Sequence, residues 1–343
     1  MRLEHTVETL RLATPLRISR GAMSERDAVR LTLSDDRGHG RGEVVTSPRL
    51  GVDAESVALA LTRVADWMGA DDAVALRARL PELRAALPEA LPVVAAVDCA
   101  VHDYLATVAG VPLCDLLGLP RWDHVPTAYT VGLGTVEEAA ASAARVTATG
   151  FTVLKVKVGV PDPAADIARV RAVRAAAPAA ALLLDPNGAW DAPTAIEVLA
   201  ALTDCAPAAL EQPVPAHDLD GLARVAAALA VPVIADEAAA RVADLSALPP
   251  GIAGVNVKLA ECGGLDAALV MIEWAAAARV GVMLGCLVGS SLSIAPAAHL
   301  TGIARWVDLD GHLLLADDPW RGLGGADGTL RRPAGPGLGV TRR

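Results

Sequence analysis

The sequence predicts an α/β protein in which a barrel of alternating strands and helices follows a smaller α+β domain. Eight short apolar runs follow one another from residue 125 onwards, alanine-rich helical stretches separate them, and the residues before them lack this alternation. Strands that alternate with helices of this length pair in parallel through right-handed crossovers. Eight such strands fit a closed barrel better than an open sheet.

The first domain is predicted over residues 1–122. Alternating apolar residues indicate strands over 3–12 and 28–34, and Asp35-Asp36-Arg37-Gly38 is typical of a hairpin turn before a third strand over 42–45. Helices are predicted over 53–68, 73–80 and 93–109. A sheet followed by helices is typical of an independent α+β domain.

The barrel domain is predicted over residues 123–315, and its elements alternate regularly. Strands are expected over 125–131, 152–158, 181–185, 208–211, 232–236, 254–258, 280–285 and 305–309. Helices are expected over 137–149, 163–176, 192–202, 219–229 and 265–278. An open doubly wound sheet would require a glycine-rich phosphate loop after its first strand, and Gly132-Leu133-Gly134 is too short for that role. The glycine- and proline-rich tail over 316–343 is expected to pack back on the first domain.

Composition and charge exclude several classes of protein. Hydrophobic residues make up 53% and charged residues 20% of the chain, which is typical of a globular protein. The net charge of −10 argues against a nucleic-acid partner, because phosphate binding requires clustered lysine and arginine. Five cysteines without CxxC spacing and an N-terminus without an apolar segment favour the cytoplasm. No segment is predicted to span a membrane.

Three acidic residues lie at near-equal spacing, each at the end of an apolar run. They are Asp185, Glu211 and Asp236, and they are 26 and 25 residues apart. One strand, one helix and two turns take such a length, so all three side chains are expected on the rim formed by the C-terminal strand ends. Carboxylates without neighbouring histidine or cysteine suit a hard divalent cation. We therefore predict Mg²⁺, for which Mn²⁺ can substitute.

Three lysines flank this acidic set. Lys155 and Lys157 precede it by one repeating unit, and Lys258 follows it by one. Lys155 and Lys157 are two residues apart in one strand, so both point to the same face. Like charges at that distance lower the pKa of one lysine and prepare it as a general base. Because Lys258 comes from the far side of the acids, amines would face both sides of a substrate α-carbon.

The order of these motifs resembles the muconate-lactonizing-enzyme subgroup of the enolase superfamily. The matching segments are Lys155-Val156-Lys157-Val158-Gly159, Asp185-Pro186-Asn187-Gly188, Glu211-Gln212-Pro213, Ala235-Asp236-Glu237, Asn256-Val257-Lys258-Leu259 and Cys262-Gly263-Gly264. In the first domain, Gly40-Arg41-Gly42-Glu43 and the stretch from Asp98-Cys99-Ala100 to Gly118 also match. The resemblance implies a (β/α)7β modified TIM barrel with an N-terminal capping domain that forms a lid over the substrate. It also implies that Asp185, Glu211 and Asp236 bind Mg²⁺, that Lys157 and Lys258 are the acid and base groups, and that Lys155 adjusts Lys157.

The eighth predicted strand indicates which reaction of the subgroup applies. Asp308 and Asp310 would present two carboxylates on one inward face. In the dipeptide epimerases of this subgroup, such an Asp-x-Asp binds the α-ammonium group of the substrate. Anionic substrates would be repelled there. The resemblance therefore implies a Mg²⁺-dependent isomerase that inverts the α-carbon of the C-terminal residue of a dipeptide. It would do so by two-base proton transfer through an ene-diolate.

Further substrate contacts are expected from Asn187, Ser290 and the segment 15–23, which should reach over the site. That segment contains Arg17 and Arg20, and an inward-facing arginine, in particular Arg20, would favour an acidic side chain on the second residue of the dipeptide. Relatives commonly carry a glutamate where this chain has Gly289. This departure affects the expected fit of the substrate near the seventh strand.

Other functions remain open on the sequence alone. Within the subgroup they are o-succinylbenzoate synthase, N-acylamino acid racemase and muconate cycloisomerase. A barrel that binds a ligand without catalysis is the alternative from another class. Beyond the small-molecule substrate we expect no nucleic-acid partner, no membrane partner and assembly into a homo-oligomer.

Overall fold

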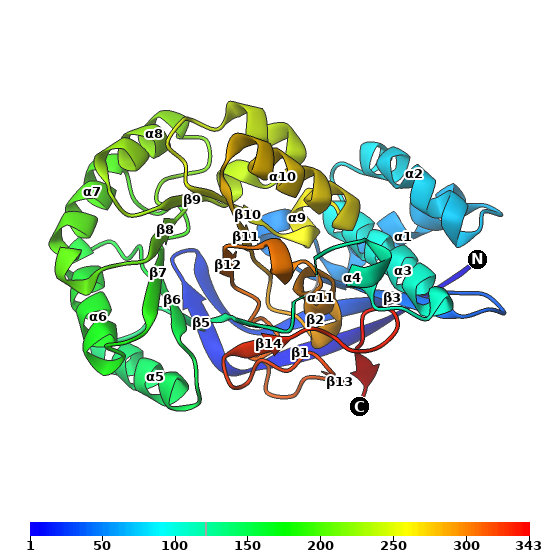
Figure 1. Cartoon of the computed structure of the whole chain (residues 1–343), viewed down its shortest axis with the longest axis horizontal. Coiled ribbons are helices and arrows are strands. Elements are labelled where there is room, and N and C mark those ends of the chain that lie inside the picture. The colour runs from blue at the N-terminus through cyan, green and yellow to red at the C-terminus, as the bar shows by residue number, and fades with distance from the viewer. Residues whose placement is uncertain (121) are drawn as a thin grey trace.

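A computed structural model describes residues 1–120 and 122–343 of the chain (Figure 1). The N-terminal part forms an antiparallel sheet in the order β1-β2-β3. Its strands are β1 (Arg2–Ile18), β2 (Gly21–Ser34) and β3 (His39–Val45). β1 and β2 extend much further than predicted, and the segment expected as a loop over 15–23 is the end of their hairpin. Leu16 pairs with Met23 there, after a register shift that follows Arg11.

Helices cover this sheet on one side. They are α1 (Ala54–Met68), α2 (Ala73–Ala86), α3 (Leu91–Ala109) and α4 (Leu113–Leu116), with the short 3-10 helix η1 (Pro48–Leu50). Asp53 and Asp72 begin α1 and α2 by accepting hydrogen bonds from backbone N–H groups of the first turn. α2 continues past Pro81, where the sequence predicted its end. Leu31, Leu33, Leu76 and Leu80 are fully buried between sheet and helices.

α3 corrects one prediction from the sequence. With 19 residues and a mean hydropathy of 1.4 it is long and apolar enough to cross a membrane, contrary to the expectation that no segment qualifies. In the structure 83% of its apolar window is buried, because it packs between the N-terminal sheet and the barrel. Its composition is that of a core helix.

The second part of the chain forms an eight-stranded sheet, in which the order β12-β11-β10-β9-β8-β7-β6-β5 is the reverse of the order along the chain. All seven pairings between neighbours are parallel, so the C-terminal ends of the strands meet at one rim. The strands are β5 (Ala128–Val131), β6 (Val153–Lys157), β7 (Ala181–Asp185), β8 (Ala209–Glu211), β9 (Val233–Ala235), β10 (Gly254–Val257), β11 (Gly281–Leu284) and β12 (Trp306–Val307). The predicted barrel is confirmed, with each strand inside its expected range.

Helices form the outer layer of the barrel (Figure 1). They are α5 (Val136–Ala148), α6 (Pro163–Ala176), α7 (Ala192–Ala201), α8 (Leu219–Ala228) and α10 (Leu265–Ala278). The helices α9 (Leu259–Cys262) and α11 (Ser291–Ala298) instead contact α3 and β3 of the N-terminal part. Short 3-10 helices occur as η2 (Thr203–Cys205), η3 (Glu237–Ala239), η4 (Val242–Ala247) and η5 (Thr301–Ile303). Between β9 and β10 the structure has the 3-10 helices η3 and η4 and no α-helix.

Side-chain hydrogen bonds join the two ends of the barrel sheet. The Leu309 N–H donates to Thr127 Oγ1, and the Thr130 N–H donates to Asp310 Oδ2. The remaining strands are short: β4 (His124–Pro126) pairs with β14 (Thr329–Arg331), and β13 (Trp320–Arg321) pairs with β15 (Thr341–Arg342). The C-terminal segment also contacts the N-terminal part, where the Leu338 N–H donates to Asp103. The division at residues 122 and 315 stays a prediction.

Candidate active site

The strand ends of the barrel and the N-terminal hairpin enclose a cavity of about 690 Å³. From the barrel it is lined by Thr130, Lys155, Lys157, Asn187, Lys258, Cys286, Asp308 and Asp310. From the N-terminal part it is lined by the hairpin of β1 and β2 and by the segment 46–49. This volume suits a small organic ligand.

The three predicted acids lie at the ends of three adjacent strands. Asp185 ends β7, Glu211 ends β8, and Asp236 follows β9 directly. All three are buried, with exposed fractions of 0%, 1% and 1%. Apolar residues surround each of them because the strands are buried on both faces, as is typical of parallel sheets. The equal spacing in the sequence therefore reflects three successive β–α units.

Lys155 lies among the carboxylates. Its Nζ atom is 2.7 Å from Glu211, 2.8 Å from Asp308 and 3.1 Å from Asp185. Burial alone would lower the pKa of Lys155, but the charges of Asp308, Glu211 and Asp185 outweigh it and raise this pKa well above its usual value. Carboxylates and not the second ammonium group dominate the surroundings of Lys155, so Lys155 is not the lysine whose pKa the sequence predicts to be lowered.

The other two lysines flank the row of acids. Lys157 Nζ lies 2.5 Å from Asp185, and Lys258 Nζ lies 2.5 Å from Asp236. Both line the cavity, and β7, β8 and β9 separate the strands that carry them. Asp236 and Glu261 raise the pKa of Lys258 despite its burial. The two amines thus approach the cavity from opposite ends of the acidic row.

The acids have the chemistry of a Mg²⁺ site. Their donor set is three carboxylates without sulfur or imidazole, which fits a hard cation. Burial and the neighbouring Asp185 carboxylate raise the pKa of Glu211 to about 8, because a further negative charge is unfavourable beside the other acids. The carboxylate oxygens of the three acids face lysine ammonium groups. They lie farther from one another than the ligand atoms of Asp98, His102 and Asp266 do. A divalent cation would compete with the lysines for the same oxygens.

Asp308 and Asp310 both line the cavity, as the sequence predicted for their position. Asp308 pairs with Lys155, whereas Asp310 accepts a hydrogen bond of 2.6 Å from the Thr130 N–H. Burial and the neighbouring Asp308 raise the pKa of Asp310 to about 7. Asp308 and Asp310 are neighbouring carboxylates, and Lys155, the lysine that pairs with Asp308, is shared with the acidic row. A cationic group of a ligand would therefore be favoured beside them.

The hairpin of β1 and β2 reaches across the barrel, and its tip lies at the end of β7 (Figure 1). Ser19 Oγ donates to the Pro186 carbonyl, and Arg20 donates to the Asn187 carbonyl at 3.4 Å. Arg20 lines the cavity but is already paired with Glu237 at 2.6 Å, and Arg17 does not line it. The expectation that Arg20 awaits an acidic substrate side chain is therefore not supported.

Asn187 lines the cavity and orients Asp185. Its backbone N–H and its side-chain amide both donate to the Asp185 carboxylate, at 2.8 and 3.1 Å. These bonds hold the residue in the left-handed region at φ 50°, an unfavourable conformation for a residue with a β-carbon. Gln212 is also left-handed, at φ 35°, and its Oε1 accepts from the Asp236 and Ala238 N–H groups. Two of the four described non-glycine residues with a positive φ therefore lie beside the acids.

Ser290 is not brought to the cavity. It is fully buried, and its hydroxyl donates to Glu43 Oε2 at 2.5 Å while its N–H donates to Glu43 Oε1 at 2.9 Å. A β-carbon built on Gly289 would lie 3.4 Å from Glu43 Oε1 and 2.3 Å from Ser293 Oγ. A glutamate at position 289 would therefore crowd the carboxylate that β3 supplies, which gives a physical reason for glycine at this place.

The sequence analysis missed several residues that support the acids. Asn256 on β10 donates to Glu211 at 2.9 Å, and Arg49 pairs through two nitrogens with Glu261 beside Lys258. Asn256 lies two residues before Lys258 and so shares its face of the strand, a signal that could have identified it. Arg49 gave no such signal, because its partner is 212 residues away in the chain.

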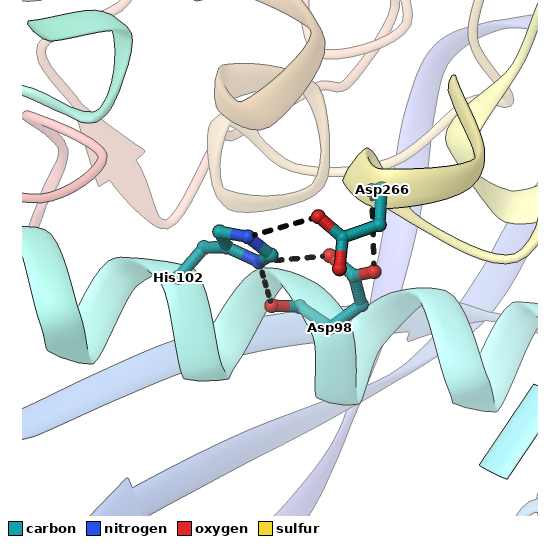
Figure 2. A group of neighbouring side chains, drawn as sticks. All are labelled: Asp98, His102 and Asp266. Carbon is teal, nitrogen blue, oxygen red and sulfur yellow. Dashed lines mark hydrogen bonds and ion pairs between the residues drawn. The ribbon is translucent and has the colours of Figure 1, made fainter. Parts of the chain in front are cut away.

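A second buried charged cluster lies between α3 and α10 (Figure 2). His102 and Asp98 are fully buried on α3, and the His102 ring lies 3.0 Å from the Asp98 carboxylate and 3.4 Å from that of Asp266. Burial alone would lower the pKa of His102, but Asp266 and Asp98 raise it to about 10. His102 is therefore a buried and charged residue, and one of its two acidic partners, Asp266, is remote in the sequence.

Asp98 also holds the loop that follows Lys258. Its carboxylate accepts from the Leu265 N–H at 3.0 Å and from the Asp266 N–H at 3.4 Å, at the start of α10. Gly264, the residue before that helix, has no side chain to satisfy these donors, so Asp98 replaces the missing cap. A β-carbon at Gly264 would lie 2.5 Å from the Asp98 side chain.

Comparison with known proteins identifies the class to which this fold and site belong. Residues 2–118 match the model of the mandelate racemase / muconate lactonizing enzyme N-terminal domain, and residues 138–343 match that of the enolase C-terminal domain-like family. The chain belongs to this family of the enolase superfamily, and the resemblance inferred from the motifs is confirmed.

Its relatives within the family include dipeptide epimerases. The chain is 31% identical over 342 residues to the hydrophobic dipeptide epimerase of Roseobacter litoralis, covering 99% of this chain and 98% of that protein. It is 34% identical over 315 residues to the L-Ala-D/L-Glu epimerase of Escherichia coli, covering 90% and 92%.

Solved structures give the same result. The L-Ala-D/L-Glu epimerase of Bacillus subtilis, in a substrate-liganded complex, superposes with a TM-score of 0.94 at 29% identity, covering 99% of this chain and 98% of that chain. The dipeptide epimerase of Methylococcus capsulatus, complexed with Mg and the dipeptide L-Arg-D-Lys, superposes with a TM-score of 0.89 at 33% identity, covering 99% and 98%.

Proposed function

We propose that this protein is a Mg²⁺-dependent dipeptide epimerase that inverts the α-carbon of the second residue of its substrate. The observation that carries the proposal is the placement of Lys157 and Lys258 at opposite ends of the acidic row, with Asp308 and Asp310 beside the same cavity. Two amines on opposite sides of one carbon can remove a proton from one face and deliver a proton to the other. The names of the family members compared above support this choice of reaction.

Each group of the substrate then has a partner in the cavity. The α-ammonium group of the first residue would pair with Asp308 and Asp310. The α-carboxylate of the second residue would lie at the acidic row, with its α-carbon between Lys157 and Lys258. Lys155 pairs with Glu211 and Asp185 of the acidic row and also with Asp308. It would therefore keep the acidic row at a fixed distance from Asp308.

Asp185, Glu211 and Asp236 would hold the metal ion. When bound, Mg²⁺ or Mn²⁺ supplies positive charge to the substrate carboxylate and so makes the α-proton easier to remove. The chain itself contributes the transfer of the proton, because one lysine must be a neutral amine while the opposite one is an ammonium group. The hairpin of β1 and β2 lies over the rim, where it contacts residues that follow β7 and β11.

Proton exchange in D₂O tests the reaction. The protein should incorporate deuterium at the α-carbon of the second residue of a dipeptide in the presence of Mg²⁺, and should produce both epimers. Lys157→Ala should abolish turnover, since the other described amine on that side of the cavity, Lys155, is already paired with Glu211, Asp185 and Asp308. Retained epimerisation by Lys157→Ala, or equal turnover in EDTA, would exclude the mechanism.

The same assay separates the related reactions. N-succinylamino acids lack the free ammonium group that Asp308 and Asp310 require, so they should exchange more slowly than dipeptides. We further propose that the protein acts in the cytoplasm and assembles as a homo-oligomer, which fractionation and light scattering would examine.

A further inference from the structure

Three arginines line the cavity, and the protein neutralises two of them. Arg20 is paired with Glu237, and Arg49 is paired with Glu261. Arg26 forms no ion pair with a carboxylate in the described part of the chain, and its Nη1 atom donates a hydrogen bond of 3.4 Å to the Val288 carbonyl. The cavity therefore contains a guanidinium group whose charge the described residues leave uncompensated.

This arginine is costly for the empty protein. Arg26 is half-buried, and burial, with repulsion from Arg49, lowers its pKa to about 10. The group remains charged at neutral pH, so the protein carries a partly desolvated cation without a counter-ion. A carboxylate from a ligand would offset that cost, and guanidinium binds carboxylate through two parallel hydrogen bonds.

The position of Arg26 indicates which part of a ligand it meets. The tip of the hairpin lies over the end of β7, where Arg20 contacts Asn187. Arg26 lies farther along β2 and contacts Val288, in the segment after β11. β11 is the neighbour of β12, which Asp308 follows directly. Arg26 therefore lies near the end of β11, between the strand end that carries the two aspartates and Arg49 beside Lys258.

The backbone of a dipeptide leaves one place for an additional anion. On the proposed function, on which this inference rests, the α-carboxylate lies at the acidic row and the α-ammonium group at Asp308 and Asp310. The carbon that bears the ammonium group also bears the side chain of the first residue, which therefore starts beside these aspartates. A cavity of about 690 Å³ has room for an extended side chain there.

We propose that Arg26 binds an acidic side chain on the first residue of the dipeptide, so that the preferred substrates begin with aspartate or glutamate. The second residue meets the hairpin tip, where Arg20 is already neutralised by Glu237. An acidic preference at the first position and not at the second is the specific consequence.

Matched substrates and variants test this assignment. Deuterium exchange with Mg²⁺ would be measured for L-Asp-L-Ala and L-Glu-L-Ala against the neutral isosteres L-Asn-L-Ala and L-Gln-L-Ala. Arg26→Met removes the guanidinium group. Arg17→Met removes the same charge from the same hairpin at an exposed position that does not line the cavity. Wild type should prefer acidic over neutral first residues by about tenfold or more in kcat/KM, as expected for a hydrogen bond between charged groups.

The ratio of the two rates distinguishes the outcomes. Arg26→Met should bring the acidic-to-neutral ratio to about one or below, because the variant lacks the guanidinium group that favours the acidic side chain. Arg17→Met should keep the wild-type ratio, because Arg26 is still present. A wild-type ratio near one, or a high ratio that survives Arg26→Met, overturns the inference while leaving the epimerase function in place. Faster exchange of N-succinyl-L-alanine than of every dipeptide overturns both, as does the absence of exchange with all of them.

Discussion

The protein contains two buried charged networks that differ in what satisfies them. At the barrel rim, Asp185, Glu211 and Asp236 are held mainly by lysine and amide side chains that face a cavity. Between α3 and α10, the Asp98 carboxylate is held by two backbone N–H groups, by Arg84 and by His102 (Figure 2). Backbone donors at the start of a helix cannot leave, whereas lysine side chains can change partners. The first arrangement suits chemistry, and the second suits a fixed junction.

The largest expected effect is the loss of epimerisation when a lysine of the rim is replaced by arginine. Lys258→Arg keeps the positive charge at the rim, but arginine does not give up a proton in proteins. Epimerisation should fall by about 10²–10⁴-fold, the usual contribution of a general acid or base. Steady-state kinetics would be compared with thermal unfolding, and a variant that keeps wild-type turnover would show that charge alone is required.

The cation at the centre of the rim should matter for stability as well. Lys155→Met leaves Glu211, Asp185 and Asp308 without a shared partner, so unfolding in EDTA should become easier by about 3–5 kcal/mol. Added Mg²⁺ should stabilise this variant more than it stabilises wild type, because the ion replaces part of the missing charge. Denaturant unfolding with and without Mg²⁺ measures this, and equal stabilisation of both proteins would contradict a metal site at these acids.

The interdomain network should respond in the opposite way. Asp98→Ala removes the cap of α10 and the partner of Arg84 and His102, and we expect a loss of about 3 kcal/mol of stability. Mg²⁺ should recover no more stability here than in wild type. Turnover per folded molecule should stay within a few-fold. Loss of all turnover in well-folded protein would instead place Asp98 among the groups that hold Lys258 in position.

The most gradual effect is a dependence of stability on pH. His102 has a folded pKa of about 10 against an ordinary value of 6.5, so the folded state binds the extra proton between these values. Its contribution is complete below the ordinary pKa and is lost as the pH rises, by about 1.4 kcal/mol per pH unit between pH 7 and 9. Unfolding of His102→Gln at several pH values should lack this slope. Parallel profiles for both proteins would contradict a charged His102.

The sequence predicted the elements that repeat and missed those that depend on remote contacts. The bounds of β7, α6 and α10 agree with the prediction at both ends, because apolar periodicity and capping residues are local. The hairpin beyond Leu12 was missed, since its pairing with β2 and with the segment near Leu315 is not encoded by neighbours. Likewise, Asp98 and His102 lie on a mainly apolar helix, and Asp266 is far away in the chain.

One compositional signal would have found the rim directly. The chain has three lysines, Lys155, Lys157 and Lys258, and all of them lie at the candidate site. Arginine supplies the permanent positive charge everywhere else. Lysine has been kept where an amine that can lose its proton is useful, and arginine serves wherever a permanent charge is enough.

This distribution gives the molecule a distinctive outer chemistry. With exposed fractions of 2%, 8% and 8%, the lysine amines are withdrawn from the exterior of the molecule. Succinimidyl dyes should therefore leave all three lysines of the folded protein unmodified. Acylation of a lysine would report that the hairpin had lifted from the barrel.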